Sequence, residues 1–283
     1  MARPALRVMR NGPHLVYTEH NSWDCYGAAT RYSNACTFPL DDAQFAVSNA
    51  ARESVPAPLR KRVEVLTHGI DTGPLRSSVR DRIETRKSLG IGEDEFVITN
   101  LAHLRAEKAQ DDLLHAAAQL VDSHPEVVLL SVGHGPRDEE LERLHQRLGL
   151  GDRFRFLGFR DDAADILAAS DVFCLSSRQE GLPVAFMEAS ALGVPTVSTR
   201  VGGIPDHIED RESGLLVTPG DVEGLSDALA RIADDAELRS RLGSAALGHS
   251  QVFDARLAVR RQEQVYVELC NAASRASLAA GTD

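Results

Sequence analysis

The stretch from Asp171 to Gly203 constrains the fold more than any other part of the chain. It begins with a short apolar run, residues 172–175, which is typical of a buried parallel strand. A polar loop follows, and a helix is expected to begin at Pro183 and to end at Gly193. Residues 196–199 predict a second strand, which completes a βαβ unit.

Strands and helices alternate along the rest of the chain from residue 95. Strands are expected at 96–101, 127–132, 154–157 and 214–217, and helices at 111–123, 137–148, 163–169, 222–234 and 236–250. This spacing predicts a mostly parallel, three-layer α/β domain. Before it, strands are expected at 15–18, 45–47 and 63–66, with a helix at 26–38.

We therefore expect an α/β chain with a complete C-terminal Rossmann-like domain and a partial N-terminal Rossmann-like lobe. The partial lobe covers residues 1–75, and a linker with a short helix at 79–89 covers residues 76–92. The complete domain covers residues 93–252. A last helix at 255–273 and a tail make up residues 253–283.

Charge and composition exclude several classes of function. The net charge of −11 argues against general nucleic-acid binding. Residues 1–88 carry 13 Lys+Arg against 9 Asp+Glu, so this segment could face an anionic acceptor or a membrane surface, or could carry solvated arginines only. The sequence shows no membrane-length apolar run and no signal-peptide core, and its four cysteines form no CxxC pair. A reduced, cytoplasmic setting is expected.

Polar residues and glycines follow the predicted strands of the larger domain. Arg105 and Lys108 suit a diphosphate, although both could be surface cations. Gly133 and Gly135 let the backbone approach a ligand, although a plain tight turn would also explain them. Arg160 follows a further strand and is a weak signal by itself.

Two carboxylates bracket the turn between the first strand and the helix of residues 171–203: Glu180 lies in the loop and Glu188 on the expected helix, with seven residues between them. The helix that begins at Pro183 would direct its free backbone amides toward the edge of the sheet where the strands end. The N-terminus of a helix can bind an anion through these amides and its dipole. Glu180 would repel a phosphate beside it, so we expect it to accept hydrogen bonds from neutral hydroxyls, as on a sugar. Glu188 could hold a second diol, such as a ribose. Together with the cations, this set fits a nucleotide-diphosphate sugar.

The chain resembles the family 4 glycosyltransferases of the GT-B fold. Glu180 and Glu188 match the E-x7-E motif of that family, within EGLP at 180–183, EA at 188–189 and GVP at 193–195. The resemblance continues in the segments VGGIP at 201–205, SGLL at 213–216, PGD at 219–221, LRAEK at 104–108, GHGP at 133–136, TEH at 18–20, VS at 47–48 and HGID at 68–71.

The resemblance implies a nucleotide-sugar donor site in the larger domain and a catalytic role for four residues. Arg105 and Lys108 would hold the leaving diphosphate, Glu180 would contact the donor sugar, and His20 would lie near the transferred sugar. Glu188 would take the ribose hydroxyls. The other donor-binding residues would be Gly181, Leu182 and Pro183 at the sugar or phosphates, and Gly133, Gly135 and Arg160 around the base.

The family transfers sugars with retention of anomeric configuration and usually without a metal, and this chain has no D-x-D at the end of a predicted strand. Neither a metal nor a cofactor is therefore expected. The expected partners are a nucleotide sugar and an acceptor that is a glycan, a lipid or a small molecule. Peripheral contact with the inner face of a membrane is a further expectation.

The chain departs from the family pattern at its beginning. Several strands and a glycine-rich loop of the family's N-terminal domain have no counterpart before residue 15, so an upstream start, a partner chain and a fragment all stay open. Ala102 and His103 replace the usual Gly-Arg, which makes Arg105 a shifted candidate, and Asp206 replaces a frequent Glu. The alternatives are a non-catalytic nucleotide-sugar-binding chain and, more weakly, a nicotinamide-dependent oxidoreductase without its G-x-G-x-x-G motif.

Overall fold

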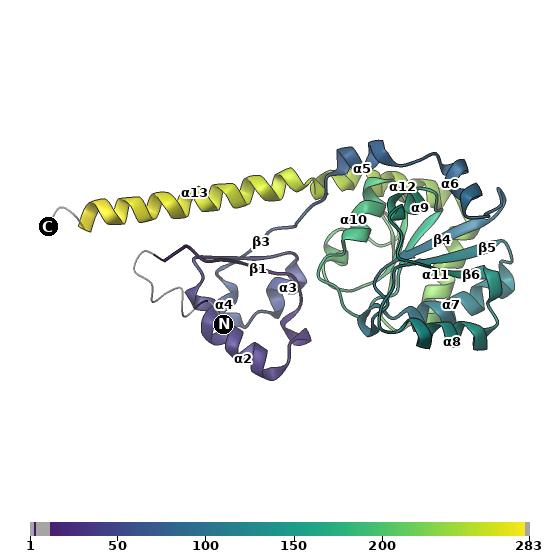
Figure 1. The fold of residues 1–283 in the computed structure, drawn as a ribbon, viewed down its shortest axis with the longest axis horizontal. Helices are drawn as coiled ribbons and strands as arrows, with labels where there is room; N and C mark the ends of the chain where they lie inside the picture. Colours follow the sequence, from purple (N-terminus) through teal and green to yellow (C-terminus); the bar gives the residue numbers. More distant parts are fainter. Residues whose placement is uncertain (1–2, 4–11, 281–283) are drawn as a thin grey trace. The chain divides into compact units, whose positions relative to one another are not determined.

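The protein is described by a computed structural model that covers residue 3 and residues 12–280. The chain divides into two compact units (Figure 1). The first contains residues 1–69 together with residues 253–283, and the second contains residues 70–252. No helix in the described part of the chain is both long enough and apolar enough to cross a membrane.

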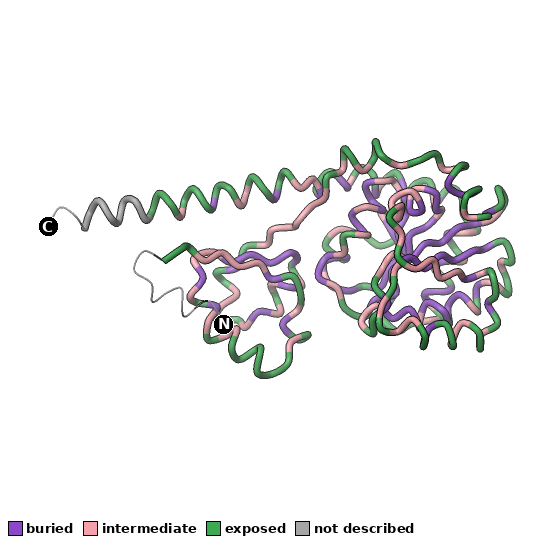
Figure 2. Tube along the Cα trace, in the orientation of Figure 1, coloured by how far each residue is buried: buried purple, intermediate pink, exposed green. Residues whose placement is uncertain are grey.

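The second unit is built on a parallel sheet of six strands in the order β6-β5-β4-β7-β8-β9. The strands are β4 (Phe96–Leu101), β5 (Val127–Val132), β6 (Phe154–Gly158), β7 (Val172–Leu175), β8 (Thr196–Thr199) and β9 (Leu215–Val217). Apart from β6, whose residues are mostly half-buried, they are short runs of largely buried residues, and Figure 2 shows them at the buried centre of this unit. The parallel Rossmann-like domain expected from the sequence is confirmed.

Helices surround this sheet. They are α5 (Thr72–Ser78), α6 (Arg82–Ser88), α7 (Gln110–Ser123), α8 (Asp138–Leu148), α9 (Ala163–Ala168), α10 (Val184–Ala191), α11 (Val222–Asp234) and α12 (Ala236–His249). Short 3-10 turns, η3 (Ala106–Lys108), η4 (Gly151–Arg153) and η5 (Ile204–Asp206), lie between them, and η6 (Ser250–Phe253) ends the unit.

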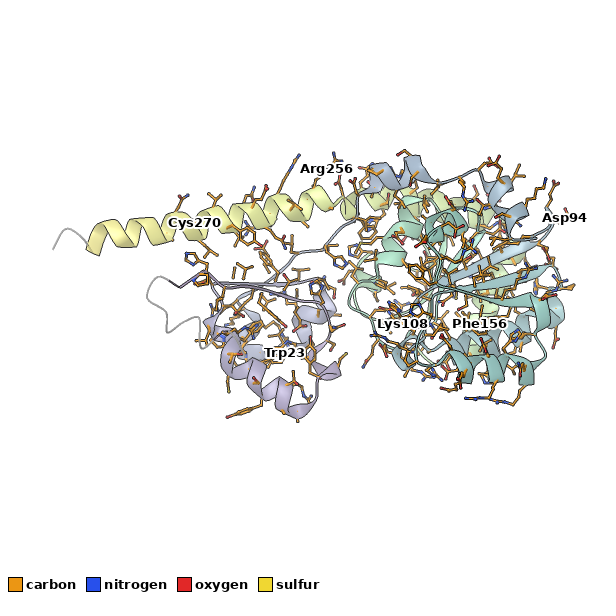
Figure 3. The ribbon with its side chains drawn as sticks, viewed as in Figure 1. Trp23, Asp94, Lys108, Phe156, Arg256 and Cys270 are labelled. Atoms are coloured by element: carbon orange, nitrogen blue, oxygen red, sulfur yellow. The ribbon has the colours of Figure 1, made fainter. Side chains whose placement is uncertain are left out.

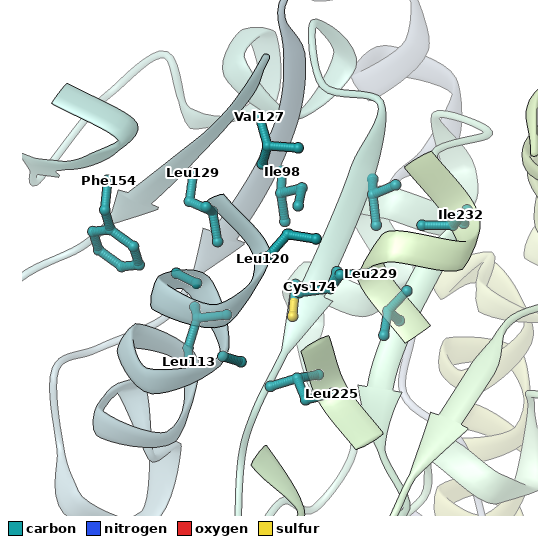
Figure 4. Packing of buried hydrophobic residues seen from close by; sticks show 14 of the residues in the cluster. Ile98, Leu113, Leu120, Val127, Leu129, Phe154, Cys174, Leu225, Leu229 and Ile232 are labelled. Carbon is teal, nitrogen blue, oxygen red and sulfur yellow. The ribbon is translucent and has the colours of Figure 1, made fainter. Parts of the chain in front are cut away.

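Side chains alternate between the two faces of the sheet, as successive strand residues must. On β4, Ile98 packs into the larger apolar cluster and Val97 into a smaller one. The larger cluster joins the sheet to α7 and α11, as Figure 4 shows for Ile98, Leu113, Leu120, Leu129, Phe154, Cys174, Leu225, Leu229 and Ile232. The smaller cluster includes Ile166 of α9. Both faces are thus covered, which explains why most residues of the strands are apolar.

The first unit contains a parallel sheet of three strands in the order β1-β2-β3. Its elements are β1 (Val16–Glu19), η1 (Trp23–Cys25), α2 (Ala28–Thr37), η2 (Phe38–Leu40), β2 (Ala43–Ala46), α3 (Asn49–Ser54), α4 (Ala57–Arg60), β3 (Val63–Val65) and α13 (Ala255–Ala280). Trp23, labelled in Figure 3, meets Phe38 edge to face in its small core, with ring centroids 5.5 Å apart. Arg261 of α13 forms a bidentate ion pair with Glu64 of β3.

Three expectations about local structure are wrong. The helix expected at residues 79–89 is shorter than expected: α6 begins after its N-cap Asp81, because the chain is extended at Val79. The helices α3, α4 and α5 lie where none was expected. Pro183 is the N-cap of α10 rather than its first residue, with an extended ψ of 132°.

Residues 76–92 belong to the second unit and pack against the rest of it. Arg80 pairs with Asp165, and Arg82 and Arg86 both reach Asp171. Arg86 is only 8% exposed, and it also donates to backbone carbonyl oxygens near β4. This arginine set fixes α6 against the sheet.

Candidate functional site

The carboxyl ends of β4, β5, β6 and β7 lie at one edge of the six-stranded sheet, because the strands are parallel. Backbone hydrogen bonds join the loops that leave this edge. The amide of Arg178 donates to the carbonyl of Glu107 over 2.8 Å, and the amide of Leu104 donates to the carbonyl of His134 over 3.1 Å. Open α/β sheets bind ligands at this edge, and we call the region the carboxyl-edge site.

Lys108 and Glu180 form the polar centre of the carboxyl-edge site. The Lys108 Nζ lies 2.7 Å from each of the two carboxylate oxygens of Glu180. The hydroxyl of Ser177 donates to Glu180 Oε1 over 2.7 Å. The Glu180 side chain is only 6% exposed and the Lys108 side chain 21% exposed, so the pair is largely shielded from water. From the sequence, Lys108 was expected to bind the diphosphate and Glu180 the donor sugar. In the structure the two side chains lie in direct contact.

An arginine network fixes the loop that carries Glu180. Arg178 donates to both carboxylate oxygens of Asp112 on α7, over 2.8 and 2.9 Å. Beside it, Arg137 donates to Asp111 over 3.0 Å. Burial alone would raise the pKa of Asp111, but hydrogen bonding and charge from Arg137 lower it below its ordinary value. Sequence analysis missed Arg178, because a single arginine in a polar loop carries no periodic signal.

Arg105 lies on the same loop as Lys108 but differs from it in exposure. It is the N-cap residue of η3, and its side chain is exposed. The turn that follows places Lys108 toward Glu180. The backbone of Ala109 then adopts a left-handed conformation with φ of 47°, which is rare for a residue with a side chain.

A cavity of about 310 Å³ adjoins this loop. Its lining includes Gly133, Arg160 and Glu188, three residues that the sequence indicated together. Gly133 has a φ of 130°, and a Cβ atom there would lie 2.1 Å from the carbonyl oxygen of Ala102. Only glycine fits this position. Gly135 is not among the lining residues, and it lies against the backbone of Leu104.

Aromatic rings form one rim of the cavity, which sequence analysis missed. His103 and His134 meet with centroids 5.8 Å apart, and His134 meets Phe159 with centroids 6.1 Å apart. Phe159 is 69% exposed, although a phenylalanine is ordinarily buried. We call these three residues the aromatic rim. An exposed ring at the mouth of a cavity can stack on a flat ligand.

Glu188 lies on α10 and lines the same cavity. Burial raises the pKa of its carboxyl above the ordinary value, since the charged form loses its hydration. A perturbed carboxyl in a cavity is typical of functional sites. Hydroxyl donors from a ligand would restore the lost hydrogen bonds.

Arg160 also lines the cavity, but its guanidinium group is already engaged. It donates to both carboxylate oxygens of Asp162, over 2.7 and 2.8 Å. Asp162 also accepts a hydrogen bond from Arg80. The Arg160 side chain remains 36% exposed.

The loop before α10 is held by a second loop, residues 201–206. The amide of Gly203 donates to the carbonyl of Gly181 over 2.6 Å. Gly202 has a φ of 56°, and a Cβ atom there would lie 2.3 Å from the carbonyl oxygen of Glu180. Gly181 and Leu182 are buried beneath this contact. The backbone at Glu180 is therefore fixed on both sides.

His20 belongs to the first unit, directly after β1. Its side chain is exposed, and its ring lies edge-on to that of His68 with centroids 6.0 Å apart. Burial, and to a smaller degree His20, lowers the pKa of His68.

The polar groups of the carboxyl-edge site are a lysine, two carboxylates, a hydroxyl and backbone amides. These groups are suited to phosphate oxygens and sugar hydroxyls. Within residues 12–280, no three His, Cys, Asp or Glu side chains are grouped as a metal site would require.

The family model described as "Glycosyl transferases group 1" matches residues 81–248, more than half of the chain. N-acetyl-alpha-D-glucosaminyl L-malate synthase of Bacillus anthracis is 34% identical over 191 residues, which cover 67% of this chain and 50% of that protein. D-inositol 3-phosphate glycosyltransferase of Kribbella flavida is 34% identical over 203 residues, which cover 68% of this chain and 47% of that protein. The chain spans about half the length of these relatives.

Solved structures give the same result for the fold. HepE of Anabaena, in complex with UDP-glucose, is 26% identical with a TM-score of 0.82, over 92% of this chain and 72% of that one. Sucrose-phosphate synthase of Thermosynechococcus elongatus has a TM-score of 0.81 over 95% of this chain and 70% of that one, at 23% identity. The expected GT-B fold is confirmed, and the chain belongs to the group 1 glycosyl transferases.

Proposed function

We propose that this chain acts in glycosyl transfer from a nucleotide-diphosphate sugar to the hydroxyl of an acceptor, with retention at the anomeric carbon and without a metal or cofactor. One observation carries the proposal: Lys108 Nζ lies 2.7 Å from both oxygens of Glu180. A cation and a carboxylate that can accept hydrogen bonds from hydroxyl groups therefore lie in direct contact. They lie beside a cavity whose lining includes a second carboxylate, that of Glu188. HepE, with 26% identity, was solved with UDP-glucose, which supports this class of donor.

The contact between Lys108 and Glu180 suits the junction between phosphate and sugar. A lysine ammonium has three N–H groups, and two of them face the carboxylate of Glu180. Since no other hydrogen bond of Lys108 Nζ is seen within the described residues, its third N–H group could donate to a phosphate oxygen of the donor. Glu180 would then accept a hydrogen bond from a sugar hydroxyl beside that phosphate. Arg105, exposed on the same loop, would add a second cation for the diphosphate.

The nucleoside would occupy the cavity of about 310 Å³. Glu188 would accept hydrogen bonds from the ribose hydroxyls. Gly133 would let the backbone approach the base, and Arg160 would border it. The aromatic rim would stack against the flat face of the base, an interaction that does not select one base strictly.

During transfer, negative charge develops on the departing diphosphate. Lys108 and Arg105, together with the amides that begin α10 beside Gly181, Leu182 and Pro183, would neutralise it. These groups perform the task that a metal ion performs in other transferases. By the resemblance to family 4, we propose transfer with retention and a role for His20 near the transferred sugar.

The acceptor is proposed to carry a free hydroxyl. L-malate and D-inositol 3-phosphate appear in the names of two relatives, and both are small polar hydroxyl compounds that serve as first probes. We also propose a cytoplasmic location, with peripheral membrane contact where the acceptor is a lipid.

The test measures binding and turnover separately. Titration calorimetry with UDP, GDP and ADP should show binding of at least one of them, and Glu188→Gln should weaken it. The matched control is Glu142→Gln, an exposed residue of α8. Slow hydrolysis of the corresponding sugar nucleotide, and transfer to malate or inositol phosphate, should depend on Lys108 and Glu180. Binding without turnover would refute the transfer proposal, and no binding of any nucleotide would refute the donor site itself.

A further inference from the structure

A buried carboxylate, Glu19, ends strand β1 of the first unit. Its side chain is 0% exposed. It accepts three hydrogen bonds: from the Tyr17 hydroxyl over 3.0 Å, from the Tyr26 hydroxyl over 2.6 Å and from the Asn21 amide over 3.2 Å. We call Glu19, Tyr17 and Tyr26 the carboxylate–phenol cluster. The function proposed above gives this cluster no role.

Burial of a carboxylate is costly unless donors surround it. Here the donors are the two phenols and one backbone amide. Within the described residues, Glu19 forms no ion pair with an arginine or a lysine. An apolar side chain at the end of a strand would be buried at lower cost. The presence of the carboxylate therefore requires a reason beyond packing.

The two phenols of the cluster keep their protons near neutral pH. Burial, followed by the hydrogen bond to Glu19 and its charge, raises the pKa of Tyr26 to about 12. Burial and then Glu19 also raise the pKa of Tyr17 above its ordinary value. Both phenols thus remain hydrogen-bond donors, and the arrangement around the carboxylate does not change with pH near neutrality.

The carboxylate–phenol cluster fixes the backbone next to His20. His20 stands between Glu19 and Asn21, and the Glu19 side chain fixes the Asn21 amide. The amide of Val47, which directly follows the neighbouring strand β2, donates to the carbonyl of Glu19 over 3.0 Å. The backbone is therefore fixed on both sides of His20, whose side chain remains exposed.

We infer that Glu19 is a positioning residue for transfer, because its carboxylate holds the loop that presents the His20 imidazole. This inference rests on the proposed function, in which His20 lies near the transferred sugar. Glu19 itself is buried and cannot touch a substrate. Tyr17 and Tyr26 complete the support by orienting the Glu19 carboxylate.

The first experiment compares Glu19→Gln with Glu53→Gln, an exposed residue of α3 in the same unit. Displacement of a reacting group by about 1 Å costs roughly a hundredfold in rate. We expect Glu19→Gln to lower kcat at least about tenfold, with the Kd for the nucleotide unchanged. Glu53→Gln should leave both values unchanged. An unchanged kcat in Glu19→Gln, or an equal loss of nucleotide affinity, would overturn the inference.

A double-mutant cycle tests whether Glu19 acts through His20. The variants are His20→Ala, Glu19→Gln and the combination of both. If Glu19 only positions His20, the double variant should turn over as slowly as His20→Ala alone. Additive losses would show an independent role and would overturn the inference, as would full activity of His20→Ala.

A spectroscopic measurement tests the cluster without activity. With ring-labelled tyrosine, carbon-13 NMR follows each phenol as the pH is raised. Glu19→Gln should lower the ionisation midpoint of Tyr26 from about 12, because the charge and the hydrogen bond both raise it. Tyr32, which is 75% exposed, serves as the internal control. An unchanged ionisation midpoint of Tyr26 would contradict the hydrogen bond from Tyr26 to Glu19.

The outcomes separate the two proposals. If the unaltered chain neither binds nor turns over any nucleotide sugar, the proposed function is refuted, and the inferred role of Glu19 is refuted as well. Turnover by the unaltered chain together with normal turnover by Glu19→Gln refutes only the inference.

Discussion

The substitution Glu188→Gln should move stability and nucleotide affinity in opposite directions. Burial raises the pKa of the Glu188 carboxyl in the folded chain. At neutral pH the fold must therefore hold a charge that the unfolded chain holds in water at lower cost. A neutral amide of similar shape removes this penalty, so the variant should be more stable than the unaltered protein.

The size of both effects follows from the protonation equilibrium and the expected contacts. Each unit by which folding raises the pKa corresponds to about 1.4 kcal/mol. For a domain of this size, 1 kcal/mol shifts Tm by about 2–4 °C. The stability difference vanishes below the unfolded pKa, where both states hold the proton, and is complete above the raised folded pKa. Loss of one charged hydrogen bond to a ribose hydroxyl, about 1.5–3 kcal/mol, would weaken nucleotide binding about 10- to 150-fold.

The assay combines thermal unfolding between about pH 4 and about pH 8, which brackets the carboxyl titration, with titration calorimetry at neutral pH of the nucleotide, among UDP, GDP and ADP, that the unaltered chain binds. Glu142→Gln, on the exposed surface of α8, should leave both readouts unchanged. A Glu188→Gln protein that melts at a lower temperature at neutral pH would refute the electrostatic reasoning. A variant that binds this nucleotide as tightly as before would refute the ribose contact.

Three further substitutions test other parts of the site. Lys108→Met leaves the 6%-exposed Glu180 carboxylate without its cation, and the free energy of unfolding should fall, by less than the roughly 3–5 kcal/mol of a fully buried pair. Denaturant melts would measure this, and a Lys108→Met/Glu180→Met variant should recover most of the loss. Gly133→Ala places a Cβ atom 2.1 Å from a carbonyl oxygen at a φ of 130° and should lower Tm and nucleotide affinity, whereas Gly73→Ala, with open space around it on α5, should stabilise the protein by about 0.4–1 kcal/mol. Equal effects of the two alanines would contradict the steric argument. Phe159→Ala should hardly change Tm, because the ring is 69% exposed, but should cost about 1–3 kcal/mol of nucleotide affinity through lost stacking; calorimetry that shows full affinity would count against the aromatic rim.

Sequence patterns predicted the second unit well where burial dominates. The bounds expected for β4, β5, β7, β8 and α11 are those of the structure, because buried parallel strands are short apolar runs and α11 has a regular apolar face. The pattern failed at residues 72–78, which form α5 although no helix was expected before residue 79. Proline is tolerated in the first turn of a helix, and Arg76 of α5 donates to the carbonyl of Ala191 at the end of α10, so packing within the second unit supports this helix.

The candidate site could be predicted as a set of residues but not as contacts. Parallel topology places Lys108, Glu180 and Glu188 at one edge, and the structure confirms that placement. The direct pairing of Lys108 with Glu180 depends on side-chain conformations and on the η3 turn, which residue spacing does not encode. The aromatic rim also left no signal, because His103, His134 and Phe159 come from three separate loops.

The aromatic rim and the pair of Lys108 with Glu180 differ in how freely they can change during evolution. Phe159 is largely exposed on a loop of its own, so its replacement disturbs little of the fold. Glu180 is shielded, and the backbone beside it is fixed by Gly202 and Gly203. Under the proposed function, affinity for the nucleoside could diverge between related proteins by single surface changes. The chemistry at the phosphate–sugar junction would stay the same, and laboratory redesign of nucleoside affinity should begin at Phe159.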